Sequence, residues 1–165
     1  MEEKLVKDIM VPLHDYSYVY PEDDLKRAIK LLLNSANRSY HNHRSVLVID
    51  NNKNLLGILT VRNILHSLNP NILDFNFLGT LSGFFPKSML VKGVFTGQCQ
   101  KQANQKVKDL MQTLNMVTID ENDSLIKAIY LMTKHKINSL PVTGGGKARG
   151  VIRAIDIVNE INNII

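Results

Sequence analysis

Cysteine is almost absent from this sequence, since Cys99 is the only one among 165 residues. A single cysteine excludes an internal disulfide and is typical of a reducing compartment. The N-terminus lacks the basic and then apolar pattern of a secretory signal, and no run approaches the roughly 20 apolar residues that span a bilayer. We therefore expect a soluble, cytoplasmic protein.

Acidic residues are absent from the segment between residues 75 and 108, which carries five lysines. These are Lys87, Lys92, Lys101, Lys106 and Lys108, and they equal the net charge of +5 of the whole chain. Proteins that bind nucleic acids usually spread Lys and Arg along the element that faces the groove. Because the excess positive charge is confined to one segment, we do not expect nucleic acid to be a partner.

The sequence offers little for catalysis or metal binding. Cys99 has no obvious base as a partner, and His41 and His43 have no nearby carboxylate or thiolate that would complete a metal site. The stretch TGGGKARG at 143–150 resembles a nucleotide-binding loop, but Ala148 stands where such a loop requires Ser or Thr. We therefore predict a glycine-rich hairpin there, no catalytic residues, no metal site, and a protein that is not an enzyme.

An internal repeat is the most informative feature that the sequence does contain. Four segments recur in the same order: VKDIM and VKDLM (6–10 and 107–111), DDLKRAIKLL and DSLIKAIYLM (23–32 and 123–132), SVLVID and SLPVTG (45–50 and 139–144), and GILTVRN and GVIRAID (57–63 and 150–156). We therefore divide the chain into a first repeat at 1–69, an insert at 70–105 and a second repeat at 106–165.

Each repeat shows the same succession of local patterns: a short β-favouring run, a helix, two strands and a second helix. The apolar stripes of the helices are Leu25, Ala28, Ile29 and Leu32, then Val61, Ile64, Leu65 and Leu68, and in the second repeat Leu125, Ala128, Ile129 and Met132, then Ala154, Ile157, Val158 and Ile161. The predicted fold is α+β, with a β-α-β-β-α unit occurring twice. Because one copy of about 60 residues is only marginally stable alone, we expect the halves to pack against each other across their sheets.

The insert holds all five phenylalanines of the chain, Phe75, Phe77, Phe84, Phe85 and Phe95. Disordered segments are poor in aromatic residues, so a floppy linker is not expected. We predict that these side chains pack over the repeats or across a dimer interface. The alternative is a docking surface for a partner protein or an anionic membrane, because lysines accompany the aromatic residues. We prefer the structural interpretation, so membrane contact is not expected.

The repeated motifs resemble those of the cystathionine-beta-synthase (CBS) domain family, arranged as a tandem pair, or Bateman module. The resemblance rests on VKD-[IL]-M, on the S-x-[LP]-V strand, and on the junction of Gly, two aliphatic residues, a polar residue, two spacers and Asn or Asp. It implies that the module does not itself catalyse a reaction, requires no cofactor, and binds AMP, ADP, ATP or S-adenosylmethionine in clefts between the repeats. It also implies a homodimer that regulates a partner protein, which the sequence does not identify.

The junction between the last strand and the last helix of each repeat is the candidate site. Free N–H groups and the positive end of the helix dipole make such a helix start suitable for a phosphate. The resemblance implies that the polar residue, Thr60 or Arg153, contacts phosphate and that Asn63 or Asp156 holds the ribose.

Helix capping is the alternative explanation, and it fits the two junctions unequally. Thr60 is a favoured N-cap, whereas Arg153 is a poor N-cap but well suited to phosphate. Asn63 is not the residue that a capping box favours at its position, which is Glu or Gln, and Asp156 could simply complement the helix dipole. If one cleft is occupied, we therefore expect it to be the cleft of Arg153 and Asp156.

By the same resemblance, each cleft is completed by residues of the opposite repeat. The Arg153 cleft would include Met10, Val11, Pro12, Val19 and Ser45, the Thr60 cleft would include Gln112, Thr113, Val117 and Ser139, and Arg44 is a further candidate for phosphate. For Met10, Val19 and Val117 a place in the core is the alternative.

Two functions follow from these patterns. The first is a regulatory module that binds an adenosyl nucleotide between its repeats and signals to a partner. The alternative is a ligand-independent dimerisation or protein-interaction module that uses the basic, phenylalanine-rich insert.

Overall fold

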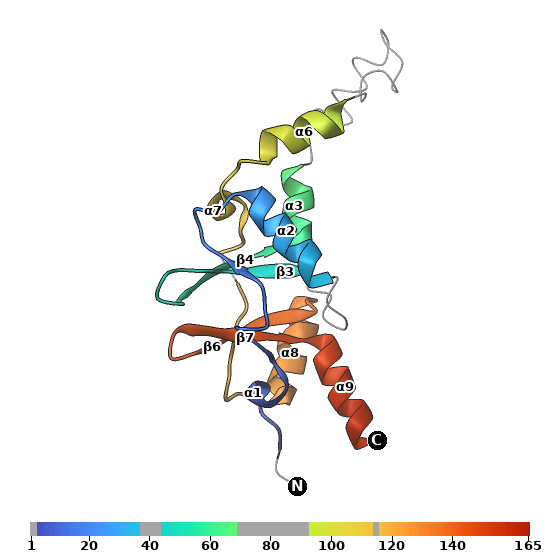
Figure 1. Ribbon diagram of the computed structural model, residues 1–165. Helices are drawn as coiled ribbons and strands as arrows, with labels where there is room; N and C mark the ends of the chain where they lie inside the picture. The colour runs from blue at the N-terminus through green and yellow to red at the C-terminus, as the bar shows by residue number, and fades with distance from the viewer. Residues whose placement is uncertain (1–2, 37–43, 69–92, 114–115) are drawn as a thin grey trace.

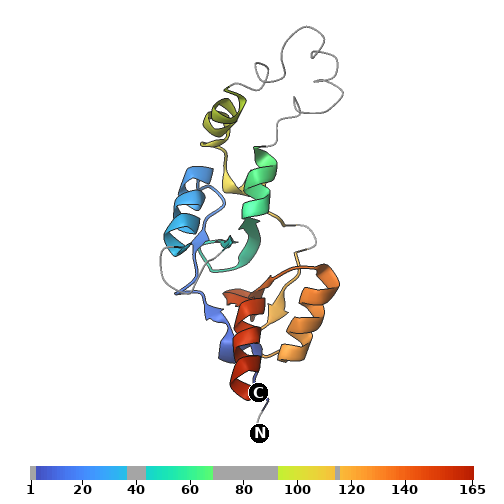
Figure 2. The ribbon, with the colours of Figure 1, turned by 90° about the vertical axis from the view of Figure 1, so that its right-hand side faces the viewer.

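Two β-sheets form the middle of the molecule, and their helices lie on the outer sides (Figure 1). The computed structural model describes residues 3–36, 44–68, 93–113 and 116–165. Over these residues one sheet has four strands in the order β1-β7-β6-β5, and the other has three in the order β2-β3-β4. Figure 2, turned by 90°, shows the same stacking, with both termini at the end of the molecule that carries the four-stranded sheet.

The first repeat has the predicted succession of elements. They are β2 (Tyr18–Val19), α2 (Leu25–Ala36), β3 (Ser45–Ile49), β4 (Leu55–Thr60) and α3 (Val61–Ser67). β2 runs parallel to β3, and β3 pairs antiparallel with β4. Leu25, Ala28 and Leu32 are buried in the core of this repeat, as their helical spacing predicts.

The second repeat has the same topology. Its elements are β5 (Ile119–Asp120), α8 (Leu125–His135), β6 (Ser139–Gly144), β7 (Lys147–Arg153) and α9 (Ala154–Ile164). The turn between β6 and β7 holds Gly145 and Gly146 at φ values of 58° and 78°, which glycine adopts without steric cost. The predicted hairpin and the twofold occurrence of the β-α-β-β-α unit are confirmed.

The segments that precede the two repeats are exchanged between them. They are α1 (Val6–Ile9) with β1 (Val11–Pro12), and α7 (Val107–Leu110). Val6 is buried in the core of the second repeat, and its N–H donates to the carbonyl O of Asp123 at 2.9 Å. Val107 is buried in the core of the first repeat, and its N–H donates to the carbonyl O of Asp23 at 2.9 Å. Each VKD motif therefore completes the other repeat, which the sequence comparison did not predict.

A glycine in each repeat makes room for the exchanged segment. A Cβ on Gly150 of β7 would lie 2.1 Å from the carbonyl O of Val11, because β1 pairs with β7 at this point. At Gly57 of β4, a Cβ would lie 2.8 Å from the carbonyl O of Gln112, whose main chain bonds to that of Ile58 in both directions. The glycine that opens each junction motif is therefore required for the close approach of two backbones.

The two sheets pack against each other through a shared apolar layer. Leu47 and Ile49 of β3 and Val151 of β7 meet in this layer. Val46 and Val48 alternate with them and belong to the core of the first repeat, so that β3 is buried on both faces. The prediction that the repeats pack across their sheets is confirmed.

In the last helix of each repeat, the outer half of the apolar stripe is exposed, whereas its spacing predicted a place in the core. In the second repeat Ile157 is buried, but Val158 and Ile161 are 55% and 45% exposed. In the first repeat Ile64 is buried, but Leu65 is 63% exposed. The reason is geometric: each helix lies on one face of a sheet, so one edge of the stripe reaches the sheet and the other edge faces outward.

Part of the insert lies within the described residues, as α6 (Val94–Gln102). Phe95 is 73% exposed, so this side chain does not pack over the repeats of its own chain. The predictions for Phe75, Phe77, Phe84, Phe85, His41 and His43 fall outside the described residues. Among the helices of the described ranges, none is long and apolar enough to cross a membrane.

Candidate functional site

The first junction is a complete capping box. β4 passes directly into α3 at Thr60, the N-cap of the helix. Asn63 N donates to Thr60 Oγ1 at 3.2 Å, and Thr60 N donates to Asn63 Oδ1 at 2.9 Å. Thr60 Oγ1 donates to the same amide oxygen at 2.6 Å. Asn63 takes the place that Glu or Gln usually has in a capping box, because its amide oxygen accepts as that of Gln would.

The second junction repeats the backbone geometry with charged side chains. β7 passes into α9 at Arg153, and Arg153 N donates to Asp156 Oδ2 at 3.0 Å. The guanidinium turns back onto the same carboxylate: Nε donates to Oδ2 at 2.8 Å, and Nη2 contacts Oδ1. Both side chains are nearly buried, with 11% and 9% of their surfaces exposed.

This ion pair changes the interpretation of the second junction. Arg153 makes no side-chain cap bond, as expected of a group without an acceptor atom. Asp156 holds it instead, so the residues predicted to contact the phosphate and the ribose contact each other. Hydrogen bonding to Asp156 raises the pKa of Arg153 above its usual value.

Tyr16 lies close to this pair and was not predicted as part of the site. Its hydroxyl lies 2.8 Å from Ser45 Oγ, and its side chain is buried in the layer between the sheets. Burial raises the pKa of Tyr16, whereas the hydrogen bond to Ser45 and the positive charge of Arg153 act in the opposite direction. The hydroxyl of Tyr16 therefore bonds to Ser45 of the first repeat and lies within the electrostatic influence of the ion pair of the second.

The repeat contains a signal that could have found Tyr16. The amides of Tyr20 and Asp120 bond to equivalent aspartates just before α2 and α8, so Tyr16 corresponds to Met116 of the second repeat. Met116 packs against the same layer between the sheets. A buried tyrosine hydroxyl needs a hydrogen-bond partner, whereas a methionine does not. A tyrosine at a buried repeat position is thus a candidate for a polar site.

The structure brings some of the predicted residues near the Arg153 junction. Pro12 pairs with Gly150 in β7, and Met10 packs on the core of the second repeat. Ser45 bonds to the hydroxyl of Tyr16, whose pKa the charges of Arg153 and Asp156 influence. Val19 is fully buried in the core of the first repeat, so that packing accounts for it.

Around the Thr60 junction the predicted residues are placed as follows. Ser45, which was predicted for the Arg153 cleft, lies opposite Thr60 in the ladder between β3 and β4. The carbonyl O of Arg44 accepts from Val61 N at 3.0 Å, which places the main chain of Arg44 at the start of α3. Thr113 is exposed.

Two residues predicted for the Thr60 cleft lie in the second repeat. Ser139 is opposite Arg153 in the ladder between β6 and β7. Val117 packs against the core of the second repeat, as the alternative reading of that residue has it.

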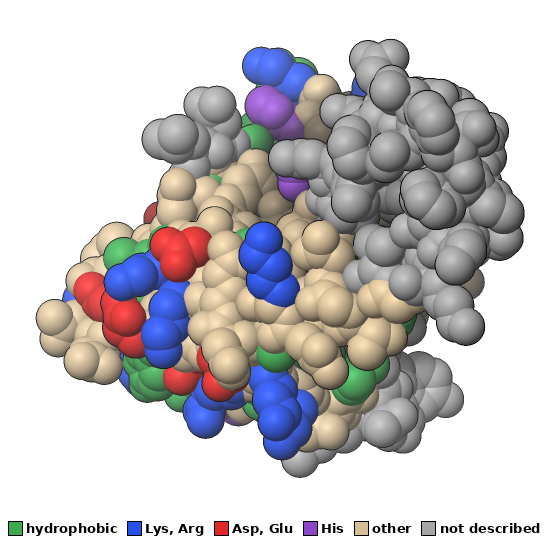
Figure 3. Space-filling view, turned by 90° about the horizontal axis from the view of Figure 1, so that it is seen from above, with side chains coloured by type: hydrophobic (Ala, Val, Ile, Leu, Met, Phe, Trp, Pro, Cys, Tyr) green, Lys and Arg blue, Asp and Glu red, His purple; other side chains and the backbone are tan. Residues whose placement is uncertain are grey.

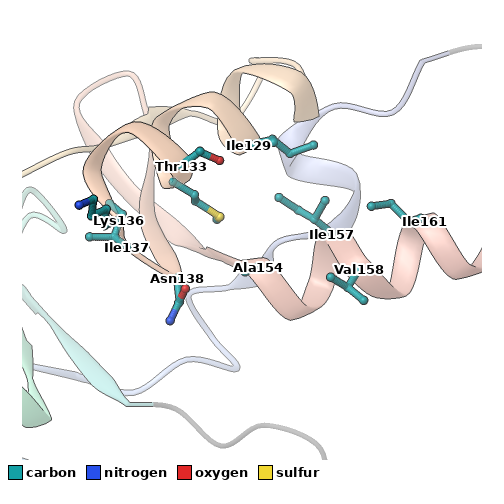
Figure 4. Close-up of a pocket in the computed structure, with 10 residues that line it drawn as sticks. Ile129, Thr133, Lys136, Ile137, Asn138, Ala154, Ile157, Val158 and Ile161 are labelled. Carbon is teal, nitrogen blue, oxygen red and sulfur yellow. The ribbon is translucent and has the colours of Figure 1, made fainter.

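A separate hollow lies between α8 and α9, on the outer side of the second repeat (Figure 4). Its volume is about 480 Å³, and its lining is mostly apolar. Ile157, Val158 and Ile161 of α9 and Ile129 and Thr133 of α8 border it. The Arg153 ion pair is not among its described lining residues, so the hollow is distinct from the predicted cleft.

Charges of both signs share the surface seen in Figure 3, where Lys and Arg side chains lie beside Asp and Glu side chains. Some of the charges are paired: Lys108 pairs with Glu22 at 2.7 Å, and Arg27 pairs with Asp23 at 3.3 Å. Within the described part of the chain, no group of three or more His, Cys, Asp and Glu side chains could hold a metal ion.

A model of the CBS domain matches residues 6–70 and 107–163 of the sequence. The chain belongs to the CBS domain family. The two matched ranges correspond to the two sequence repeats, so the molecule is a tandem CBS pair, or Bateman module. The resemblance inferred from the motifs is thereby confirmed.

Curated proteins similar to this CBS pair are longer than it is. One is an uncharacterized protein of Methanocaldococcus jannaschii, 26% identical over 119 residues, which are 72% of this chain and 24% of that protein. Another is an uncharacterized 33.4 kDa protein in the ribosomal RNA operon of Thermofilum pendens, 22% identical over 149 residues, which are 90% of this chain and 37% of that protein. The chain spans less than half the length of these relatives.

Solved CBS pairs share the fold. CBSX2 of Arabidopsis thaliana, in complex with AMP, is 22% identical, covers 97% of both chains and superposes with a TM-score of 0.67. The CBS domain pair of protein MJ0100, in complex with 5′-methylthioadenosine and S-adenosyl-L-methionine, is 18% identical, covers 99% of this chain and 100% of its own, and gives a TM-score of 0.65. At these identities the likeness shows the fold.

Proposed function

We propose that this CBS pair binds an adenosyl nucleotide at the junction of Arg153 and Asp156 and acts as a regulatory module. One observation carries the proposal: a nearly buried guanidinium and carboxylate lie together at the start of α9. Their charges influence Tyr16, whose hydroxyl lies 2.8 Å from Ser45 Oγ of the other repeat. The ligands of CBSX2 and of MJ0100, which are AMP and S-adenosylmethionine, support the ligand class.

The groups at this junction match the parts of a nucleotide. A carboxylate accepts two hydrogen bonds from the neighbouring hydroxyls of a ribose, and a guanidinium binds phosphate through two parallel bonds. The start of α9 adds the positive end of its dipole. Met10 and Pro12 supply apolar surface on the strand side, which suits a purine ring.

The position of the site gives a route from binding to regulation. Tyr16 leads from β1, which pairs with the second repeat, to β2, which pairs with the first. A ligand that draws Arg153 or Asp156 out of the pair changes the surroundings of the Tyr16–Ser45 bond. The relative position of the repeats then differs between the free and the bound states, and a partner protein that prefers one state responds to the ligand.

We also propose that two copies associate through the outer faces of α8 and α9. Ile155, Val158 and Ile161 follow one another at intervals of three residues along α9 and are exposed. Val158 and Ile161 also border the hollow of Figure 4. The first repeat exposes Val61 and Leu65 at the start of its own last helix. A second copy therefore offers the same kind of apolar surface, as symmetric dimers require.

Calorimetry with AMP, ADP, ATP and S-adenosylmethionine tests the nucleotide site. Asp156→Ala should weaken binding by about 10- to 100-fold, because it removes charge-assisted bonds. Asp8→Ala is the matched control: Asp8 Oδ2 accepts from Leu5 N at 2.7 Å, so this change removes the same kind of capping bond from α1. The control should bind like the wild type.

Two results would contradict the proposal in different ways. Absence of binding of every compound by the wild type at about 1 mM rejects the nucleotide function. Equal affinities of the wild type and Asp156→Ala reject the placement of the site at the second junction.

The exposure of Phe95 on α6 favours a second candidate function, an interaction module that works through the insert. Large exposed aromatic residues commonly serve as anchors for partner proteins. Phe95→Ser should then abolish retention of a copurifying partner without lowering the melting temperature. Retention of the partner by this variant would reject the candidate.

A further inference from the structure

Arg153 and Asp156 form a closed ion pair at the place proposed for the ligand. The guanidinium and the amide of Arg153 both donate to the Asp156 carboxylate. Little water reaches either group, because only about a tenth of each side chain is exposed. Each charge is therefore satisfied before a ligand arrives.

This ion pair disfavours the binding of an uncharged nucleoside. The hydroxyls of its ribose must take over carboxylate oxygens that already accept from Arg153. Removing the carboxylate from a nearly buried guanidinium leaves an uncompensated charge, which is strongly unfavourable. Neutral hydroxyls also form weaker hydrogen bonds to a carboxylate than a guanidinium does.

A phosphate removes this obstacle. It accepts two parallel hydrogen bonds from a guanidinium, so Arg153 keeps an anionic partner while Asp156 becomes available to the ribose. Resting on the proposed nucleotide function, we propose that Arg153 makes this cleft select adenosyl ligands that carry a phosphate, such as AMP and ADP, over adenosine. S-adenosylmethionine is disfavoured as well, because its sulfonium places a positive charge next to the ribose.

The Thr60 junction shows that the fold does not need this charge. Asn63 makes the same main-chain bond there as Asp156 makes at the second junction. Neither Thr60 nor Asn63 is charged, and α3 is capped all the same. Ligand selection is therefore an explanation for the ion pair that capping does not supply.

Calorimetric titration of the full chain with AMP and with adenosine tests the proposal, because the two compounds differ only in the phosphate. The wild type should bind AMP at least about tenfold more tightly than adenosine, which is the effect of one charge-assisted hydrogen bond. S-adenosylmethionine should bind no better than adenosine.

Arg153→Thr places the residue of the first junction in the second. In this variant AMP should bind more weakly and adenosine more tightly, until the two affinities lie within about threefold of each other. Arg149→Thr removes the same charge from the same strand, where Arg149 pairs with Glu121 at 3.3 Å, and should keep the wild-type ratio.

The Nε–Hε resonance of Arg153, assigned by its loss in Arg153→Thr, locates the event within the molecule. AMP should shift this resonance, and adenosine at the same concentration should not. A preference for AMP that leaves the resonance unmoved belongs to another site and overturns the proposal.

The affinities separate this proposal from the function on which it rests. Equal binding of AMP and adenosine by the wild type, or an unchanged ratio in Arg153→Thr, overturns the selectivity and leaves the nucleotide function standing. Equal binding of AMP and S-adenosylmethionine by the wild type likewise overturns the selectivity but not the nucleotide function. Absence of binding of every adenosyl compound at about 1 mM overturns both.

Discussion

At the Thr60 junction the N-cap amide donates to Asn63, and at the Arg153 junction the equivalent amide donates to Asp156, with N···O distances of 2.9 and 3.0 Å. The two backbones therefore solve the same capping problem in the same way. The side chains differ: the first junction is neutral, and the second holds an ion pair that excludes most water. The first junction serves as an internal control for the second. Because the first repeat folds without an ion pair at this position, the fold of the unit does not require one.

Substitution of the glycine that opens each junction should have the largest effect on stability. Gly150→Ala should destabilise the protein by about 3 kcal/mol or more, because the new Cβ collides with the main chain of β1. Gly57→Ala should cost less, about 1–3 kcal/mol, because part of its contact is with the flexible Met111 side chain. Urea unfolding of both variants checks this order, and the reverse order would show that β1 is not held as described.

Loss of the ion pair between Arg153 and Asp156 should have the next largest effect on stability. Asp156→Ala should cost about 2–3 kcal/mol, because it leaves a nearly buried guanidinium without its partner. Asn63→Ala should cost about 1 kcal/mol, as the loss of a cap does. The double variant Arg153→Thr with Asp156→Asn copies the first junction and should be more stable than Asp156→Ala alone. Unfolding free energies measure all three, and equal losses at the two junctions would contradict the assigned role of charge.

Tyr16 and Met116 extend the comparison to pH. Burial raises the pKa of Tyr16 above its usual value of about 10, so the unfolded chain loses this proton at lower pH than the folded chain does. The associated stability is present below about pH 10 and falls as the pH rises through the folded pKa. Tyr16→Phe should flatten this fall and cost about 1 kcal/mol at neutral pH, through the lost bond to Ser45. Denaturant titrations at several pH values from about 8 to about 11 measure the free energy of unfolding of both proteins. A wild-type curve that falls in parallel with that of Tyr16→Phe would contradict the prediction.

The outer helix faces should have the smallest effect on folding. Val158→Lys should leave the free energy of unfolding of the monomer within about 0.5 kcal/mol, because the side chain is exposed. The same change should shift sedimentation from dimer to monomer, because it places a charge in the proposed interface. Leu65→Lys is the matched variant in the first repeat, and unchanged sedimentation of both variants would reject these faces as the contact between copies.

The repeated unit could be predicted from the sequence because its causes are local. Helical spacing at Leu25, Ala28 and Leu32, strand alternation in β3 and the glycines of the β6–β7 turn each specify their own element. The exposed outer residues of the last helices, including Val158, were wrongly predicted to lie in the core. Their spacing identifies an apolar face but does not say how much of that face the sheet covers.

The local pattern could not predict the exchange of segments, since Val6 and Val107 stand in nearly identical motifs and the pattern does not choose between two equivalent cores. Only the family resemblance, which placed Met10 and Pro12 at the Arg153 junction, indicated it. The pairing of Arg153 with Asp156 was within reach, because residues three apart at a helix start are neighbours. It was missed because both residues had already been assigned to a ligand.

The exchanged VKD segments also govern how the chain reaches its folded state. Lys7 bonds to Asn122 across a sequence separation of 115 residues, so α1 cannot dock until most of the chain has been made. Closing so large a loop is slow, and the second repeat lacks a core residue until it happens. We therefore expect one cooperative unfolding transition for the pair, and we expect that cutting the chain between its two sequence repeats yields fragments that fold only when mixed.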